Sequence, residues 1–245
     1  MLRDPIDILG TPLTPVSYQE LTDWLQKRCG EPGTCAVDFT NTHIVTQRRQ
    51  NPAFREATES MDLFIPDGMP LIWCLNARGA DLKDRVYGPI FMRRFLEASP
   101  APWTHYFLGG SDLCVSRLRQ QMAELQPQLK VVGARHGYFS AEEETAIVEE
   151  INRLAPDFVW VGLGTPKQQA WIRRHREKIN RGILLAVGFA FDVNAGMKGD
   201  APPWMHRLGL TWLFRLCQEP RRLLGRYLKN NALFCWYCLK SLGRN

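Results

Sequence analysis

Several familiar binding patterns are missing from this sequence. Gly162 and Gly164 form a Gly-x-Gly pair without the third glycine of the dinucleotide fingerprint, and no Walker-type phosphate loop occurs. No Asp-x-Asp pair, a common metal-binding motif, is present either. These absences exclude the standard dinucleotide and P-loop sites, and they predict that any bound phosphate is held by cationic side chains and helix amides.

Long apolar runs are also missing. The longest in the C-terminal part, Ala232 to Leu239, is far shorter than the ~20 residues needed to cross a bilayer. The first residues are interrupted by Asp4, Asp7 and Thr11, so no signal peptide is expected. The sequence therefore predicts a cytoplasmic protein.

The cysteines do not have the spacing of a disulfide framework or a zinc site. The seven cysteines are an odd number and are scattered, which favours reduced thiols over disulfides. Cys235 and Cys238 form a single Cys-x-x-Cys with no second pair at zinc-binding spacing. Any role for these two cysteines stays open.

Positive charge is concentrated at one end of the chain. The chain has 245 residues, 45% of them hydrophobic, and a net charge of +6. Residues 204–245 contain eight Lys and Arg residues against Glu219 alone, so the excess of positive charge lies in this tail. The apolar content is sufficient for a real core.

Before the tail, strand-like and helix-like segments alternate. Continuous apolar runs such as Phe158–Val161 are typical of strands buried on both faces of a parallel sheet. The order predicts a doubly wound α/β fold with a mainly parallel sheet in residues 1–200 and a helical, basic appendage in residues 201–245. Strands are expected at 35–39, 63–65, 105–108, 130–132, 158–161 and 183–187, and helices at 17–29, 44–60, 69–76, 89–98, 112–125, 142–154 and from 166 onward.

Polar residues follow three of these strands. They are Thr40-Asn41, Asp67-Gly68 and the segment Thr165–Gln168, in which Thr165 is expected to cap a helix that begins near Pro166. Ligands of such sheets bind outside the carboxyl ends of the strands, so we expect the three segments to share one cleft. Alternatively, each of the three segments could simply form a turn, because Asn, Asp and Gly are common turn residues.

The tail interleaves basic residues with leucines and aromatic residues. A pair of helices with this pattern can lie in the interface of an anionic membrane, where each Lys or Arg contributes about 1 kcal/mol. Packing on the core or on a partner subunit is the alternative. Nucleic acid is not expected, because the bulky aliphatic residues exceed what a phosphate-binding face uses.

With these residues laid out, the chain resembles the WecG/TagA/CpsF family of bacterial glycosyltransferases. The resemblance spans roughly residues 41–227. The motifs that carry it are Asn41-Thr-His-Ile-Val, Ile65-Pro-Asp-Gly-Met, Arg85-Val-Tyr-Gly-Pro, Phe107-Leu-Gly-Gly, His136-Gly-Tyr-Phe, Val161-Gly-Leu-Gly-Thr-Pro-Lys-Gln, Ala190-Phe-Asp-Val-Asn-Ala-Gly and Gly209-Leu-Thr-Trp-Leu-Phe-Arg-Leu-Cys-Gln-Glu-Pro-Arg-Arg.

The resemblance implies a metal-independent, inverting enzyme without a cofactor. Such an enzyme moves a sugar, typically N-acetylmannosamine, from a UDP-sugar to a sugar on a polyprenyl diphosphate at the inner face of the bacterial cytoplasmic membrane. It implies a part in teichoic acid, common antigen or exopolysaccharide synthesis. Glucose, a uronic acid or another hexose remains open as the donor sugar, and homo-oligomers are possible.

The resemblance also implies residue roles. Asp67 would be the base, with helix capping as the alternative. Arg85 would contact the donor, and Gln168 the nucleotide. Asn41 would contact the sugar, with Thr40 an imperfect substitute for a nearby family threonine. The appendage arginines, Arg215 and Arg222, would close over the cleft and neutralise the diphosphate.

The chain departs from the family pattern at several positions, including Phe39 in place of a threonine and Gly225 in place of a third appendage arginine, with Arg226 adjacent. Gln169 replaces an acidic residue, Asp200 an arginine and Thr211 a glutamate. A nucleotide-sugar hydrolase, a transferase with a soluble acceptor, and a non-enzymatic nucleotide-binding protein recruited to membranes are the alternative functions.

Overall fold

A mainly parallel sheet forms the centre of the protein. The computed structural model describes residues 2–242, and eight strands of this part form one sheet in the order β1-β2-β4-β3-β8-β7-β5-β6. Only β1 and β2 pair antiparallel, and the other neighbours are parallel. The strands are β1 (Ile6–Ile8), β2 (Thr11–Leu13), β3 (Gly33–Thr40), β4 (Leu63–Pro66), β5 (Thr104–Gly109), β6 (Lys130–Arg135), β7 (Phe158–Gly162) and β8 (Arg181–Ala186). The predicted fold class is confirmed.

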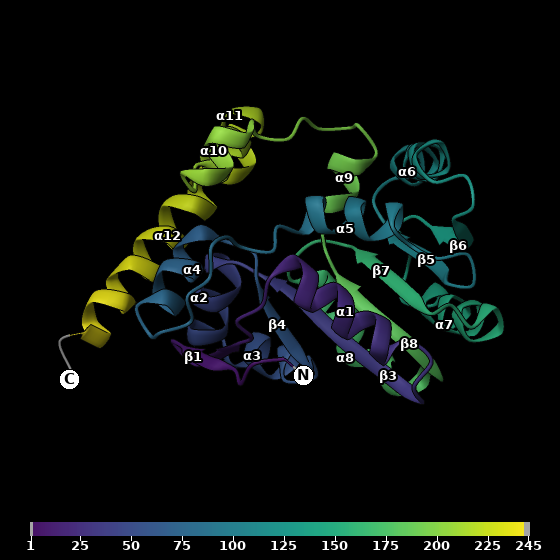
Figure 1. Ribbon diagram of the computed structural model, residues 1–245, viewed down its shortest axis with the longest axis horizontal. Coiled ribbons are helices and arrows are strands. Elements are labelled where there is room, and N and C mark those ends of the chain that lie inside the picture. The colour runs from purple at the N-terminus through teal and green to yellow at the C-terminus, as the bar shows by residue number, and fades with distance from the viewer. Residues whose placement is uncertain (1, 243–245) are drawn as a thin grey trace.

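Helices cover both faces of the sheet (Figure 1). The helices over residues 2–242 are α1 (Tyr18–Arg28), α2 (Thr42–Gln50), α3 (Pro52–Thr58), α4 (Met69–Asn76), α5 (Gly88–Glu97), α6 (Asp112–Leu125), α7 (Glu143–Leu154), α8 (Lys167–His175), α9 (Ala190–Asn194), α10 (Pro203–Arg207), α11 (Thr211–Gln218) and α12 (Pro220–Leu242). A 3-10 turn, η1 (Arg176–Lys178), follows α8.

The core divides into two clusters because successive strand side chains point to opposite faces. In β7, Val159 and Val161 join the cluster beneath α2, α4, α7 and α8, while Phe158 and Trp160 join the one beneath α1, α5 and α6. All four side chains are fully buried. This explains the continuous apolar run in the sequence.

Two local predictions are wrong. The single helix expected at residues 44–60 is broken into α2 and α3 at Asn51, whose side chain accepts a hydrogen bond from the Phe54 amide while Pro52 takes the first turn of α3. The N-terminal hairpin of β1 and β2 was not predicted, because its strands are only three residues long and give almost no periodic signal.

The appendage has three helices rather than the predicted pair. The last, α12, runs for 23 residues and lies along α2 and α4 (Figure 1). Asn231 and Tyr237 of α12 hydrogen-bond to Thr42 and Gln50 of α2. One face of α12 therefore packs on the core, as the alternative reading of the tail expected. No helix within residues 2–242 is long and apolar enough to span a bilayer, and Arg244 lies outside the described residues.

Candidate active site

A cavity of about 1040 Å³ opens where the carboxyl ends of the parallel strands meet the appendage. Asn41 after β3, Asp67 after β4 and Gln168 at the start of α8 all line it, and so do Arg85, Arg215 and Arg222. The three segments that the sequence placed at one cleft therefore do meet. Their roles in binding and catalysis remain predictions.

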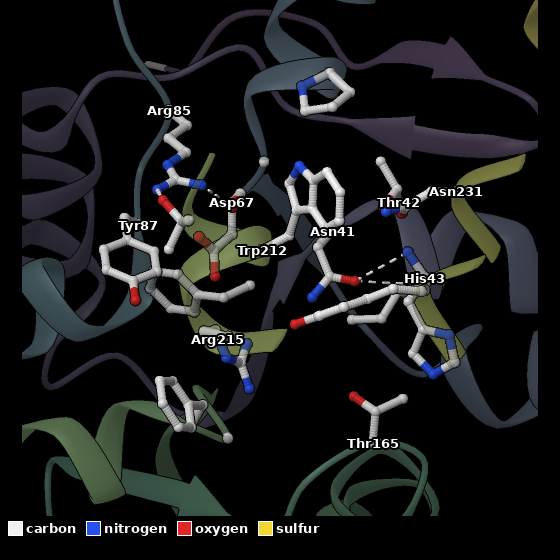
Figure 2. Close-up of a pocket in the computed structure, with 18 of the residues that line it drawn as sticks. Asn41, Thr42, His43, Asp67, Arg85, Tyr87, Thr165, Trp212, Arg215 and Asn231 are labelled. Carbon is white, nitrogen blue, oxygen red and sulfur yellow. Dashed lines mark hydrogen bonds between the residues drawn. The ribbon is translucent and has the colours of Figure 1, made fainter. Parts of the chain in front are cut away.

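Local backbone geometry places Asn41 and Asp67 side by side. The Asp67 amide donates to the Thr40 carbonyl at 2.7 Å, which ties the loop after β4 to the end of β3. Asn41 caps α2, because its side-chain oxygen accepts from the His43 and Ile44 amides. Figure 2 shows its amide nitrogen directed away from this cap.

One carboxylate oxygen of Asp67 is left without a hydrogen-bond partner. The N-cap of α4 is Gly68, with no side-chain cap, so Asp67 does not cap that helix. Its Oδ1 is buried and has no hydrogen-bond partner. Burial raises the pKa of Asp67 to about 7, against the opposing effects of Arg85, the Gly88 amide and Arg215. A carboxylate with this pKa is suited to general base catalysis near neutral pH.

Two arginines stand on different sides of Asp67 (Figure 2). Arg85 is almost fully buried, and its Nη1 is 3.5 Å from the Asp67 carbonyl oxygen. Arg215, from α11, stacks its guanidinium on the ring of Phe189 at 3.7 Å, and its buried Nε has no hydrogen-bond partner. Its guanidinium is therefore pre-positioned for an anionic ligand.

Arg222 also lines the cavity, but it is more exposed. It donates to both carboxylate oxygens of Glu219 one turn earlier, and Glu219 pairs with Lys198 as well. Burial opposes the charge on Glu219, yet the hydrogen bonds from these cations lower its pKa to about 2. An anion that binds Arg222 must share it with Glu219.

Arg85 is held from the appendage by residues that the sequence did not identify. Its Nη2 lies 2.6 Å from Thr211 Oγ1 and 2.9 Å from His206 Nδ1. Because a guanidinium only donates hydrogen bonds, Nδ1 must accept, which places the imidazole proton on Nε2. Nε2 faces Asp200 Oδ1 at 3.4 Å, and Tyr87 also donates to that oxygen.

This chain, Asp200–His206–Arg85, contains one departure from the family pattern, Asp200, and a second departure, Thr211, accepts a hydrogen bond from Arg85. Burial opposes the charge of Asp200, but hydrogen bonds from His206 and Tyr87 hold its pKa below the ordinary value. Residues 121 positions apart meet here, and no short-range signal in the sequence could show that contact.

Gln168 and Lys167 lie at the start of α8. The Gln168 side-chain oxygen accepts from the Gly164 amide, and Lys167 donates to the Gly137 carbonyl at 2.6 Å. The helix begins at Lys167 without a side-chain cap, so the predicted cap by Thr165 is wrong. The Thr165 hydroxyl instead accepts a hydrogen bond from Gln169.

Thr40 is placed differently from the prediction. It is fully buried and does not line the cavity, because it points to the opposite face of β3 from its neighbour Asn41. Its hydroxyl donates to Asp38 Oδ1 at 2.5 Å, and Gln169 donates to Asp38 Oδ2 at 2.8 Å. Direct contact between Thr40 and substrate is therefore not supported.

Asp38 is a second buried acid near the cavity. Burial raises its pKa to about 6, although the bonds from Thr40 and Gln169 act in the opposite direction. Its charge in turn raises the pKa of Asp67. Gln169 suits this position, since its amide donates where an acidic side chain would repel Asp38. An Asp inside the apolar run Cys35–Phe39 was the available signal for this residue.

Possible metal ligands are not gathered at the site. Among residues 2–242, no group of three or more His, Cys, Asp and Glu side chains is arranged to hold a metal ion. Cys238 contacts Cys74 of α4, with the two sulfurs 3.8 Å apart.

Comparison with known proteins identifies the family. The model of the "Glycosyl transferase WecG/TagA/CpsF family" matches residues 6–245. The chain belongs to this family. The predicted resemblance is confirmed, and the protein is a glycosyltransferase.

Two relatives illustrate the similarity to other WecG/TagA/CpsF members. A protein of Staphylococcus aureus (strain MW2) is 25% identical over 239 residues, covering 96% of this chain and 92% of the relative. A protein of Bacillus spizizenii (strain W23) is 27% identical over 219 residues, covering 89% and 82%. Both are named N-acetylglucosaminyldiphosphoundecaprenol N-acetyl-beta-D-mannosaminyltransferase.

Proposed function

We propose that this protein transfers a hexose from a UDP-sugar to a sugar carried on polyprenyl diphosphate, with inversion at the anomeric carbon. The observation that carries the proposal is Asp67, a buried carboxylate whose Oδ1 has no hydrogen-bond partner and whose pKa is raised to about 7, in a cavity that Arg85, Arg215 and Arg222 also line. The names of the two relatives support a lipid-linked acceptor and N-acetylmannosamine as one candidate donor sugar.

In the proposed reaction, Asp67 takes the proton of the acceptor hydroxyl as its oxygen attacks the anomeric carbon. The bond from that carbon to the diphosphate breaks, and UDP leaves with the electron pair. Arg85 and Arg215 stabilise the charge that develops on the leaving diphosphate, because guanidinium groups bind phosphate oxygens with two parallel hydrogen bonds. A side chain thus supplies the charge that a metal supplies in other transferases.

The appendage supplies Arg215 and Arg222 and packs against the core near the cavity. Its exposed leucines and tryptophans, together with its basic residues, support contact with an anionic membrane. We propose that the protein works peripherally at the cytoplasmic face of that membrane, where a lipid-linked acceptor is found.

The test is a panel of UDP-sugars with a short-chain prenyl-diphosphate N-acetylglucosamine acceptor, followed by UDP release. Release that requires the acceptor, with product of inverted configuration by NMR, is the expected result. Equal release without acceptor would instead identify a nucleotide-sugar hydrolase, and no release with any donor would refute the proposal. Activity is expected to survive EDTA.

A further inference from the structure

The cavity does not end at Asp67. It continues between α4 and α12, past the turn that follows β1, into a branch that we call the outer groove. The outer groove is lined by Ile8, Leu9, Met69, Trp73, Cys74, Ala77, Arg78, Tyr227, Phe234, Cys235, Cys238 and Ser241.

The spacing of these residues shows that two helices line the groove lengthwise. On α12 the lining residues Tyr227, Phe234, Cys238 and Ser241 follow one another at intervals of seven, four and three positions, close to two, one and one helical turns, which places them on one face. From Tyr227 to Ser241 the helix rises by about 21 Å. The groove is therefore a channel along α12 rather than a local dent.

The two parts of the cavity differ in charge. The inner part carries Arg85, Arg215 and Arg222, whereas Arg78 is the one charged residue among the described side chains that line the outer groove. A ligand that fits both parts has an anionic group followed by a hydrocarbon chain. The acceptors named for the two relatives, diphosphoundecaprenols, have this order.

The surface next to the outer groove carries exposed apolar side chains that are suited to contact with a membrane. Next to the groove-lining face of α12, the side chains of Leu228 and Leu239 are 65% and 69% exposed. By the period of the helix they flank Cys235. A chain that leaves the groove therefore meets an exposed apolar surface.

We propose that the outer groove binds the first isoprenoid units of the acceptor, with the acceptor diphosphate at Arg222 and the rest of the chain in the bilayer. This proposal rests on the proposed function for the nature of its ligand. It assigns α4 and α12 a role in acceptor binding that differs from charge neutralisation, because a hydrocarbon chain is stabilised when it leaves water for an apolar groove.

The native cysteines provide a direct test. Cys74, Cys235 and Cys238 line the outer groove, and Cys235 is exposed. Cys217 is an exposed thiol on α11 that does not line the cavity, so it serves as an internal control.

The full-length protein is treated with iodoacetamide, with and without farnesyl diphosphate, and the modified cysteines are quantified by mass spectrometry. At roughly ten times the Kd, alkylation of Cys235 is expected to slow by about tenfold while Cys217 is unchanged. Inorganic diphosphate alone is expected to protect neither. Equal effects on Cys235 and Cys217, or full protection of Cys235 by diphosphate alone, would overturn the proposal.

A pair of variants tests the groove during turnover. Cys235→Trp narrows the groove at an exposed position, and Cys217→Trp is the matched control. Cys235→Trp is expected to raise KM about tenfold for an undecaprenyl acceptor, but less than twofold for an acceptor that lacks the isoprenoid chain. Equal effects of the two variants would reject the groove. Because farnesyl diphosphate protection needs no sugar transfer, failure of the proposed function is distinguishable from failure of the groove.

Discussion

Replacing Asp67 by Asn is the most direct test of the chemistry. The amide has the same shape as the carboxylate and keeps an oxygen that can accept from the Gly88 amide, which contributes to holding the carboxylate. It removes the basic oxygen, and with it the only part of the side chain that can take a proton. Binding of UDP is expected to persist, since Arg85, Arg215 and Gln168 are unchanged.

The expected decrease in kcat follows from the role of Asp67 as a base, and the expected pH dependence follows from its pKa. A positioned general base contributes about 10²–10⁴ to the rate, so kcat of Asp67→Asn should fall by ~10² or more. With a pKa of about 7, Asp67 is roughly nine-tenths ionised at pH 8 and one-tenth at pH 6. The wild-type rate should therefore fall about tenfold over this range as the base is protonated, and the residual rate of the variant should not follow that curve.

The assay is acceptor-dependent UDP release from pH 5.5 to 8.5, with UDP affinity measured by calorimetry. Asp112→Asn is a suitable control, because Asp112 is 89% exposed and does not line the cavity. A rate for Asp67→Asn within about threefold of wild type at pH 8 would remove Asp67 from the mechanism.

Further predictions concern the neighbours of Asp67. His206→Ala should lower kcat about tenfold by freeing Arg85, whereas His206→Asn, whose carbonyl can replace Nδ1 as acceptor, should recover most of the loss; equal kcat values would argue against positioning by His206. Asp38→Asn removes a charge that raises the pKa of Asp67, so the acid limb of the pH profile should move to lower pH; an unmoved limb would show that the two acids do not interact. Truncation after residue 200 should abolish transfer to a short-chain acceptor and sedimentation with anionic liposomes; undiminished transfer would contradict a catalytic role for the appendage.

Much of the sheet could be predicted because its strands are buried on both faces. Runs such as Phe158–Val161 indicate a buried strand from only four consecutive apolar residues. The polar residues that follow β3, β4 and β7 indicate the edge of the sheet where the cavity lies. The break at Asn51-Pro52 was also readable, since Asn before Pro is a helix start signal. The alternation of β3 could likewise have shown that Thr40 and Asn41 face opposite sides.

Other parts of the site depend on tertiary contacts that leave no local trace. Nothing in the sequence around His206 marks it as a site residue. Its importance comes from the hydrogen bond that Arg85 donates to it from a distant loop. The groove along α12 needs α4 as its second wall, so the periodicity of α12 alone predicted an amphipathic helix and not a binding channel. The roles predicted for the arginines came from the resemblance to the family, because local patterns do not assign them.

The appendage changes the properties of Asp67 in two opposing ways. Trp212 and Arg215 line the same cavity as Asp67 (Figure 2). Where they exclude water they raise its pKa and make it a stronger base, but the charge of Arg215 lowers that pKa. Burial is the larger influence, so a docked appendage leaves Asp67 with a pKa of about 7 and also supplies a cation for the leaving diphosphate. If the appendage moved away, water would return to Asp67 and the same movement would remove Arg215. Base strength and leaving-group stabilisation would then be lost together, which would limit turnover to the closed enzyme.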